Sequence, residues 1–131
     1  MGFKILVADD DFDNRTIATE ILRASGYTVV QASNGLQAME VALSEKPDVI
    51  LLDLSMPKLD GWETTRRLKK IPEVARIPVI AFTAHAMVGD EKKAREAGCD
   101  DFLTKPCTPK QIIEKMKTWL GKRQASDGPG E

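Results

Sequence analysis

Short apolar runs alternate with amphipathic stretches along most of this chain. Each run has the length of a strand, is rich in β-branched or aromatic residues and is bounded by turn residues. Between the runs, apolar residues recur at helical spacing, as they do at Ile17, Ile21 and Leu22. The pattern predicts five helices in strict alternation with five strands, the strands lying at residues 3–8, 27–31, 49–52, 77–82 and 101–104.

The spacing of these strands predicts how they assemble. Strand starts recur about every 20 to 30 residues, which suits βαβ units with right-handed crossovers between parallel strands. The length of 131 residues is close to the commonest domain size, so one domain with one core is expected. The predicted architecture is an α/β doubly wound parallel sheet with helices on both faces.

Turn and capping residues mark the ends of the predicted helices. Gly26 and Gly98 stand where two helices should stop, and Asn34 and Asp60 stand where two should start. These signals agree with the alternation of strands and helices that the apolar pattern predicts.

The last predicted helix has the clearest start signal. Thr108-Pro109-Lys110-Gln111 combines a capping box with proline at the first helical position. The apolar face that follows predicts a helix ending at Gly121. We expect a folded domain over residues 1–121 and a disordered polar tail over residues 122–131.

Composition excludes several classes of protein. Nineteen basic and twenty acidic residues give a net charge of -1, so no global field attracts nucleic acid or anionic lipid. The longest apolar runs are far shorter than the roughly 20 residues that span a bilayer, and the N-terminus lacks the basic region of a signal peptide. We therefore expect a cytoplasmic protein that binds neither nucleic acid nor membrane, with Cys99 and Cys107 reduced.

One apolar run, Val49-Ile50-Leu51-Leu52, ends directly in the carboxylate of Asp53. An ionised carboxylate at the rim of a core is costly unless it is paired, hydrogen-bonded or bound to a cation. In an open α/β sheet, ligands bind outside the carboxyl ends of the strands. The other predicted strands bring to that edge Asp9-Asp10-Asp11, Thr83-Ala84 and Lys105-Pro106.

These residue types together suit phosphoryl chemistry. Carboxylates at one edge repel one another, and a hard divalent cation such as Mg²⁺ relieves the repulsion while leaving positions for phosphate oxygens. Lys105 offers a positive charge, Thr83 a hydroxyl donor and Asp53 a nucleophile that can become an acyl phosphate. Taken singly, the acids could cap a helix and Thr83 could be an ordinary strand-end residue. Their meeting at one edge favours a joint site.

The same residues resemble the signature of response-regulator receiver domains, which act in two-component signalling. The likeness covers residues 3–121 and rests on Asp9-Asp10, Asp53, Thr83-Ala84 and Lys105-Pro106. A further match is Met56-Pro57-Lys58-Leu59-Asp60-Gly61, which is similar to the M-P-x-x-D-G loop of the family. The resemblance implies a flavodoxin-like fold with strand order 2-1-3-4-5.

The resemblance also implies a role for each site residue. Asp53 would accept a phosphoryl group from a phosphohistidine of a histidine kinase or histidine phosphotransfer protein. Lys105 would pair with the phosphoryl group, and the peptide bond between Lys105 and Pro106 is expected to be cis. The implied Mg²⁺ ligands are Asp10 and Asp53 directly, Asp9 through water, and the backbone carbonyl of Ser55.

The resemblance implies a switch as well. Thr83 would move toward the phosphoryl group and Phe102, on the fifth strand, would rotate inward. The change would alter the surface of the fourth helix, fifth strand and fifth helix, which would bind an unknown downstream protein.

The domain would catalyse its own phosphorylation and dephosphorylation without being a multiple-turnover enzyme. Ser55 and His85 would line the path of the hydrolytic water, so changing either should alter the phosphoryl lifetime.

Two other functions use related folds. A haloacid-dehalogenase-like phosphohydrolase shares the aspartyl nucleophile and Mg²⁺, but it requires a second carboxylate two residues later, where this chain has Ser55. A flavin-binding protein needs a neutral phosphate loop after the first strand, where Asp9-Asp10-Asp11 would repel phosphate. Turnover of small phosphate esters would support the first alternative, and a yellow purified protein would support the second.

Overall fold

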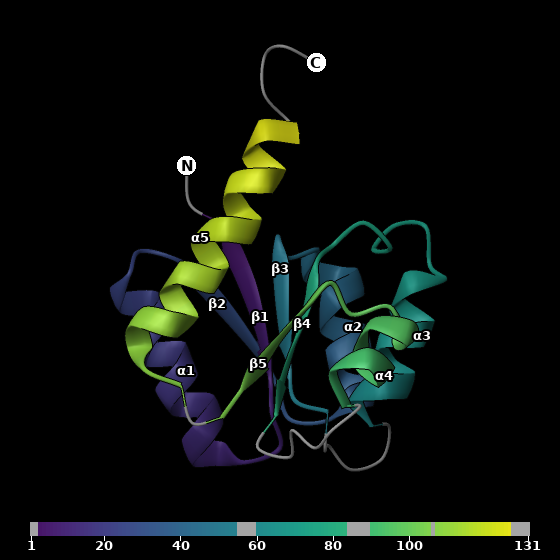
Figure 1. Cartoon of the computed structure of the whole chain (residues 1–131), viewed down its shortest axis with the longest axis horizontal. Coiled ribbons are helices and arrows are strands. Elements are labelled where there is room, and N and C mark those ends of the chain that lie inside the picture. The colour runs from purple at the N-terminus through teal and green to yellow at the C-terminus, as the bar shows by residue number, and fades with distance from the viewer. Residues whose placement is uncertain (1–2, 55–59, 84–89, 106, 127–131) are drawn as a thin grey trace.

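Strands and helices alternate along the chain in a computed structural model that describes residues 3–54, 60–83, 90–105 and 107–126 (Figure 1). The strands are β1 (Lys4–Ala8), β2 (Thr28–Ala32), β3 (Val49–Leu52), β4 (Val79–Thr83) and β5 (Asp101–Thr104). The helices are α1 (Phe12–Ala24), α2 (Gly35–Glu45), α3 (Gly61–Lys69), α4 (Asp90–Ala97) and α5 (Pro109–Ser126). The predicted number and order of elements are confirmed for this part of the chain.

None of the helices described here has both the length and the apolar character needed to cross a bilayer.

All neighbouring strands pair in parallel, in the order β2-β1-β3-β4-β5. Ala8 at the end of β1 lies beside Leu52 at the end of β3, and Thr83 lies beside Thr104. The carboxyl ends of these four strands therefore meet at one edge of the sheet, the lower edge in Figure 1. The doubly wound α/β fold and the strand order are confirmed.

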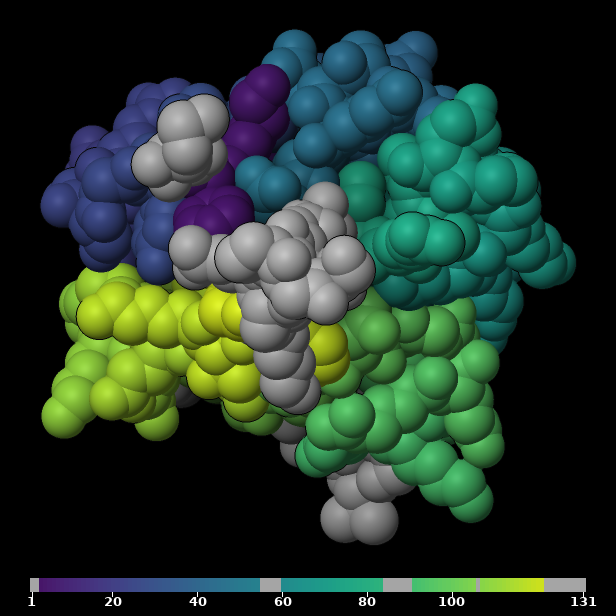
Figure 2. Space-filling model, turned by 90° about the horizontal axis from the view of Figure 1, so that it is seen from above, coloured from purple at the N-terminus to yellow at the C-terminus, as the bar shows by residue number. Residues whose placement is uncertain are grey.

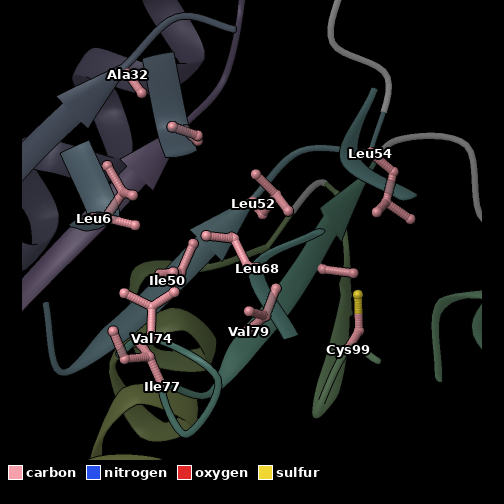
Figure 3. Close-up of a cluster of buried hydrophobic side chains, with 14 of the residues drawn as sticks. Leu6, Ala32, Ile50, Leu52, Leu54, Leu68, Val74, Ile77, Val79 and Cys99 are labelled. Carbon is pink, nitrogen blue, oxygen red and sulfur yellow. The ribbon is translucent and has the colours of Figure 1, made fainter. Parts of the chain in front are cut away.

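Helices cover both faces of the sheet and bury an apolar cluster on each. On one face, under α2, α3 and α4, Leu68 packs among residues that include Ile50 and Leu52 (Figure 3). On the other face, under α1 and α5, the buried residues include Leu22 and Met116. Burial on both faces explains why the strands read as nearly continuous apolar runs.

The predicted helix starts are confirmed by their hydrogen bonds. The side chains of Asn34 and Asp60 cap α2 and α3, each accepting from a backbone N–H three residues later, at 2.8 and 2.9 Å. At the start of α5, Gln111 N donates to Thr108 Oγ1 at 3.1 Å and Thr108 N donates to Gln111 Oε1 at 2.8 Å. This reciprocal pair is the capping box that the sequence predicts.

The predicted end of the last helix at Gly121 is wrong, because α5 continues to Ser126. A glycine ends a helix when it takes the left-handed conformation. Among the described glycines, Gly26 and Gly98 do so, with φ of 96° and 110°, and both follow helices that end where predicted. Gly121 stays within the helix at a cost of about 1 kcal/mol relative to alanine. Residues 122–126 are therefore helical, and residues 127–131 of the predicted tail lie outside the described part.

At the amino ends of the strands, Lys69 ties α3 to the loop before β5. Its ammonium donates to Asp100 Oδ2 at 2.8 Å and to the carbonyls of Ile77 at 2.8 Å and Ala75 at 3.3 Å. Asp100 also accepts from Val79 N at 2.8 Å. Figure 2 views this end of the molecule, where the teal and green surfaces of α3 and α4 meet. The Lys69 contacts fix the sheet end that lies opposite the predicted site.

Candidate functional site

Three carboxylates meet where β1 and β3 end. One oxygen from each of Asp9, Asp10 and Asp53 lies within 4.8 Å of the others. Asp53 N donates to Ala8 O at 2.9 Å, which continues the strand pairing and fixes the backbone of Asp53 against β1. Asp9 and Asp53 are 3% and 7% exposed, whereas Asp10 is exposed. Three clustered carboxylate oxygens are the hard donors that Mg²⁺ prefers, so these residues fit a magnesium ion.

Lys105 reaches this cluster from the end of β5. Its Nζ lies 2.6 Å from Asp9 Oδ2 and 3.6 Å from Asp53 Oδ2. The same ammonium lies 5.0 Å from the centroid of the Phe82 ring, and Lys105 N donates to Thr83 O at 2.8 Å. The aromatic face and the two carboxylates together stabilise the partly buried lysine charge.

The loop after β1 is held by its own hydrogen bonds. Asp11 N donates to Asp9 Oδ1 at 2.9 Å, and the Asp11 side chain caps α1 by accepting from Asn14 N at 3.0 Å. Arg15 of α1 donates to the Asp9 carbonyl at 2.8 Å. The acids after β1 therefore divide their roles, because Asp11 caps a helix while Asp9 turns its other oxygen toward Lys105.

Thr83 and Phe102 belong to the face of the sheet under α2, α3 and α4. Phe102 is half-buried and pairs with Ala81 in register, and both pack in the apolar cluster of that face. Thr83, two residues after Ala81 and 1% exposed, continues the same face by strand alternation. The two residues predicted to form the switch thus lie on one face of neighbouring strands.

Gly61 lets α3 begin directly against the backbone of the site. Its N–H donates to Leu54 O at 3.1 Å. A Cβ at this position would lie 2.5 Å from Asp53 O and 2.6 Å from Leu54 Cα, closer than real Cβ contacts. The Asp60-Gly61 pair of the predicted loop motif therefore has two physical reasons: the aspartate caps α3, and the glycine leaves room for Asp53.

The two cysteines lie outside this chemistry. Both are free thiols, as the sequence predicts. Burial raises the pKa of Cys99 and also that of Cys107. Cys107 Sγ donates to Thr104 O at 2.8 Å, so it is held as a neutral thiol.

Three predicted site residues lie outside the described part of the chain, so their roles stay predictions: Ser55, His85 and Pro106. Two observed contacts were not predicted from the sequence. They are the Phe82 ring beside Lys105 and the hydrogen bond from Arg15 to the Asp9 carbonyl. Strand alternation could have placed Phe82 on the face that Lys105 reaches, but no sequence signal marks Arg15.

Comparison with known proteins assigns the family. The family model described as the response regulator receiver domain matches residues 5–117. The chain belongs to this family. The chain is 38% identical over 121 residues to the polar-differentiation response regulator DivK of Brucella anthropi. The alignment covers 92% of this chain and 98% of that protein.

Solved receiver domains have the same fold. The receiver domain of a sensor histidine kinase from Pseudomonas aeruginosa, with a magnesium ion coordinated in its active-site cleft, matches with a TM-score of 0.86 and 35% identity, over 92% of this chain and 99% of that chain. A receiver domain protein from Methanospirillum hungatei matches with a TM-score of 0.88 and 26% identity, over 98% and 100% of the two chains. The predicted receiver domain of two-component signalling is confirmed. The phosphohydrolase and flavin-binding alternatives are set aside.

Proposed function

We propose that Asp53 accepts a phosphoryl group from a phosphohistidine of a histidine kinase or histidine phosphotransfer protein. Phosphoryl transfer to an aspartate is the function of the receiver family. The observation that carries the proposal is the convergence of Asp9, Asp10 and Asp53 beside Lys105. Of the three acids, Asp53 follows the middle strand of the sheet, whereas the Asp9 carboxylate already accepts from Asp11 N and Lys105 and Asp10 is exposed.

The proposed step balances without a further reactant. A carboxylate oxygen of Asp53 attacks phosphorus, and the new O–P bond forms as the P–N bond of phosphohistidine breaks. The electron pair of that bond returns to the imidazole nitrogen, and the product on this chain is an acyl phosphate. Hydrolysis by water later restores the carboxylate. In this proposal the domain is a phosphoacceptor that catalyses its own phosphorylation and dephosphorylation, and is not a multiple-turnover enzyme.

We assign Mg²⁺ to the three carboxylates. Asp10 and Asp53 would bind it directly and Asp9 through water, together with the backbone carbonyl of Ser55. When bound, the ion supplies positive charge that offsets the clustered carboxylates and the phosphoryl oxygens. The magnesium ion in the active-site cleft of the related Pseudomonas aeruginosa receiver domain supports this assignment.

Lys105 and Thr83 would stabilise the phosphorylated state. Lys105 is 3.6 Å from Asp53 Oδ2, so a small movement away from Asp9 brings its ammonium to a phosphoryl oxygen. The hydroxyl of Thr83, at the end of β4, would donate a hydrogen bond to a second phosphoryl oxygen. Phe102 would then rotate inward on the face it shares with Thr83, changing the surface of α4, β5 and α5 for a downstream protein.

Intact mass measurement tests this proposal. Incubation with Mg²⁺ and acetyl phosphate should add one phosphoryl group to the wild-type chain, and excess EDTA should prevent it. Asp53→Asn should gain none. Asp13→Asn removes the same charge from the exposed first turn of α1 and should be modified like the wild type. An Asp53→Asn chain modified to the wild-type extent would reject Asp53 as the acceptor.

A further inference from the structure

Asp101, the first residue of β5, joins three elements through one carboxylate. Its Oδ1 accepts from Phe102 N at 2.8 Å, and its Oδ2 accepts from Trp119 Nε1 of α5 at 2.8 Å. Lys115 Nζ, also on α5, lies 3.0 Å from Oδ2, and an Arg95 guanidinium nitrogen of α4 lies 3.7 Å from Oδ1. The Asp101 side chain is 17% exposed, whereas the Arg95 side chain is half exposed, so Arg95 makes the most solvent-screened of these contacts.

The position of Asp101 explains why its contacts matter. Within the described sheet β5 is the last strand, and a backbone N–H on its outer edge has no strand to pair with. The Asp101 carboxylate accepts from the N–H of Phe102 in place of a strand. The backbone of the residue proposed to rotate is therefore held by a side chain that is also bound to α5.

The neighbouring carboxylate shows a different pattern. Asp100 accepts from Lys69 Nζ and from Val79 N, both at 2.8 Å. These contacts join α3 to the start of β4 and do not involve α5 or the Phe102 backbone. Two adjacent aspartates, one just before β5 and one at its first residue, thus contact different parts of the fold, which makes Asp100 a matched comparison for Asp101.

We propose that Asp101 is a positioning residue that fixes the Phe102 backbone and couples it to α5. The two oxygens of the carboxylate point to donors on two elements, so a shift of Phe102 N displaces the acceptor of Trp119 Nε1. The inference rests on the proposed function, because it requires Phe102 to rotate on phosphorylation. It predicts that the rotation reaches Trp119 through Asp101.

Asp101→Asn separates this coupling from simple packing. Asparagine has nearly the same volume, but one of the two oxygens becomes an NH₂ donor, so only one of the two donors, Phe102 N and Trp119 Nε1, keeps an acceptor at its present position. Asp100→Asn removes the same charge one residue earlier and leaves the Asp101 contacts in place. A difference between the two variants in the change of the Trp119 signal on phosphorylation reports the coupling.

Tryptophan fluorescence measures the coupling directly. The chain has two tryptophans, so a Trp62→Phe background leaves Trp119 as the reporter. Emission and intact mass are followed on the same samples after Mg²⁺ and acetyl phosphate are added. In the parent and in Asp100→Asn, the emission should change in step with phosphoryl uptake. In Asp101→Asn, phosphoryl uptake should proceed and most of the emission change should be lost.

The outcomes separate this inference from the proposed function. A full emission change in phosphorylated Asp101→Asn, or none in the phosphorylated parent, would overturn the role of Asp101. A parent that takes up no phosphoryl group would overturn the proposed function, and the inference with it.

A second measurement needs neither phosphorylation nor the Asp101 variant. Trp119→Phe keeps an aromatic ring, removes the indole N–H donor and makes the ring smaller. If Asp101 couples the two sites, the backbone amide resonance of Phe102 should shift in this variant, in a ¹⁵N-labelled sample. The amide of Val79, bound to Asp100, should stay in place. An unmoved Phe102 resonance would contradict the coupling even if Asp101→Asn fails to fold.

Discussion

Lys105 Nζ pairs with Asp9 Oδ2 at 2.6 Å, and this ion pair joins the end of the last strand to the loop after the first. The lysine and aspartate side chains are 13% and 4% exposed, so each neutralises a charge that water cannot reach well. Asp53 lies at 3.6 Å from the same ammonium. The lysine charge is therefore held beside the proposed phosphoacceptor before any phosphoryl group arrives.

Removal of the Lys105 charge should destabilise the fold as well as the phosphorylated state. Lys105→Met leaves the Asp9 charge buried without its cation and should lower the free energy of unfolding by about 3 kcal/mol in EDTA. Asp9→Asn in the same chain should restore part of this loss, because the unpaired charge is gone. Urea denaturation of the single and double variants measures the coupling. If the losses of unfolding free energy in the two single variants simply add in the double variant, Lys105 is not the main partner of Asp9.

Gly61 and Gly121 should respond in opposite directions to alanine. Gly61→Ala places a Cβ against the backbone of Asp53 and Leu54, and should cost about 1 to 3 kcal/mol and slow phosphoryl uptake. Gly121→Ala meets no atom within 4 Å inside α5, and should stabilise by up to about 1 kcal/mol without changing uptake. Thermal unfolding and acetyl phosphate kinetics distinguish them. Equal uptake rates in both variants would show that Gly61 does not position Asp53.

Lys69 should matter for stability and not for phosphorylation. Lys69→Met removes donors from Asp100 and from two carbonyls at the sheet end away from the site, and should cost about 1 to 3 kcal/mol. Lys70→Met, on an exposed neighbour, should change little. Denaturant unfolding gives the first value and uptake kinetics under folded conditions the second. Slower uptake in a fully folded Lys69→Met would mean that the two ends of the sheet are coupled.

The Asp101 carboxyl should make stability depend on acid pH. Burial tends to raise its pKa, but hydrogen bonds from Trp119, the Phe102 N–H and Lys115 outweigh this and hold the pKa below its ordinary value of 3.8. A lowered folded-state pKa adds stability that is present above pH 3.8 and is lost as pH falls through the folded-state value. Asp101→Asn should therefore be less stable than wild type near neutral pH, and the gap should narrow below pH 3.8. A gap that stays constant down to pH 2 would contradict this.

Local sequence signals predicted the elements well, and their ends less well. Thr108 and Gln111 lie three residues apart, so their capping box follows from local geometry. β4 begins at Val79 and not at residue 77, because Ile77 N donates to Val74 O in a turn. The helix past Gly121 was missed because glycine lowers helix stability without forbidding it.

The site was predicted as a set of residues but not as a set of contacts. Strand order brings Asp9, Asp53, Thr83 and Lys105 to one edge, and alternation within strands is readable from sequence. Which carboxylate takes the Lys105 ammonium depends on side-chain packing between residues 96 apart, which no local pattern encodes. The double role of Asp101 is likewise set by the packing of α5 against β5.

Identification of the modified side chain decides whether Asp53 is the phosphoacceptor. After incubation with Mg²⁺ and acetyl phosphate, borohydride reduces an aspartyl phosphate to homoserine, and peptide mass spectrometry then locates the change. We expect homoserine at position 53, with Asp9 and Asp10 unchanged. Homoserine at another position, or a phosphoryl gain with no homoserine at all, would contradict it.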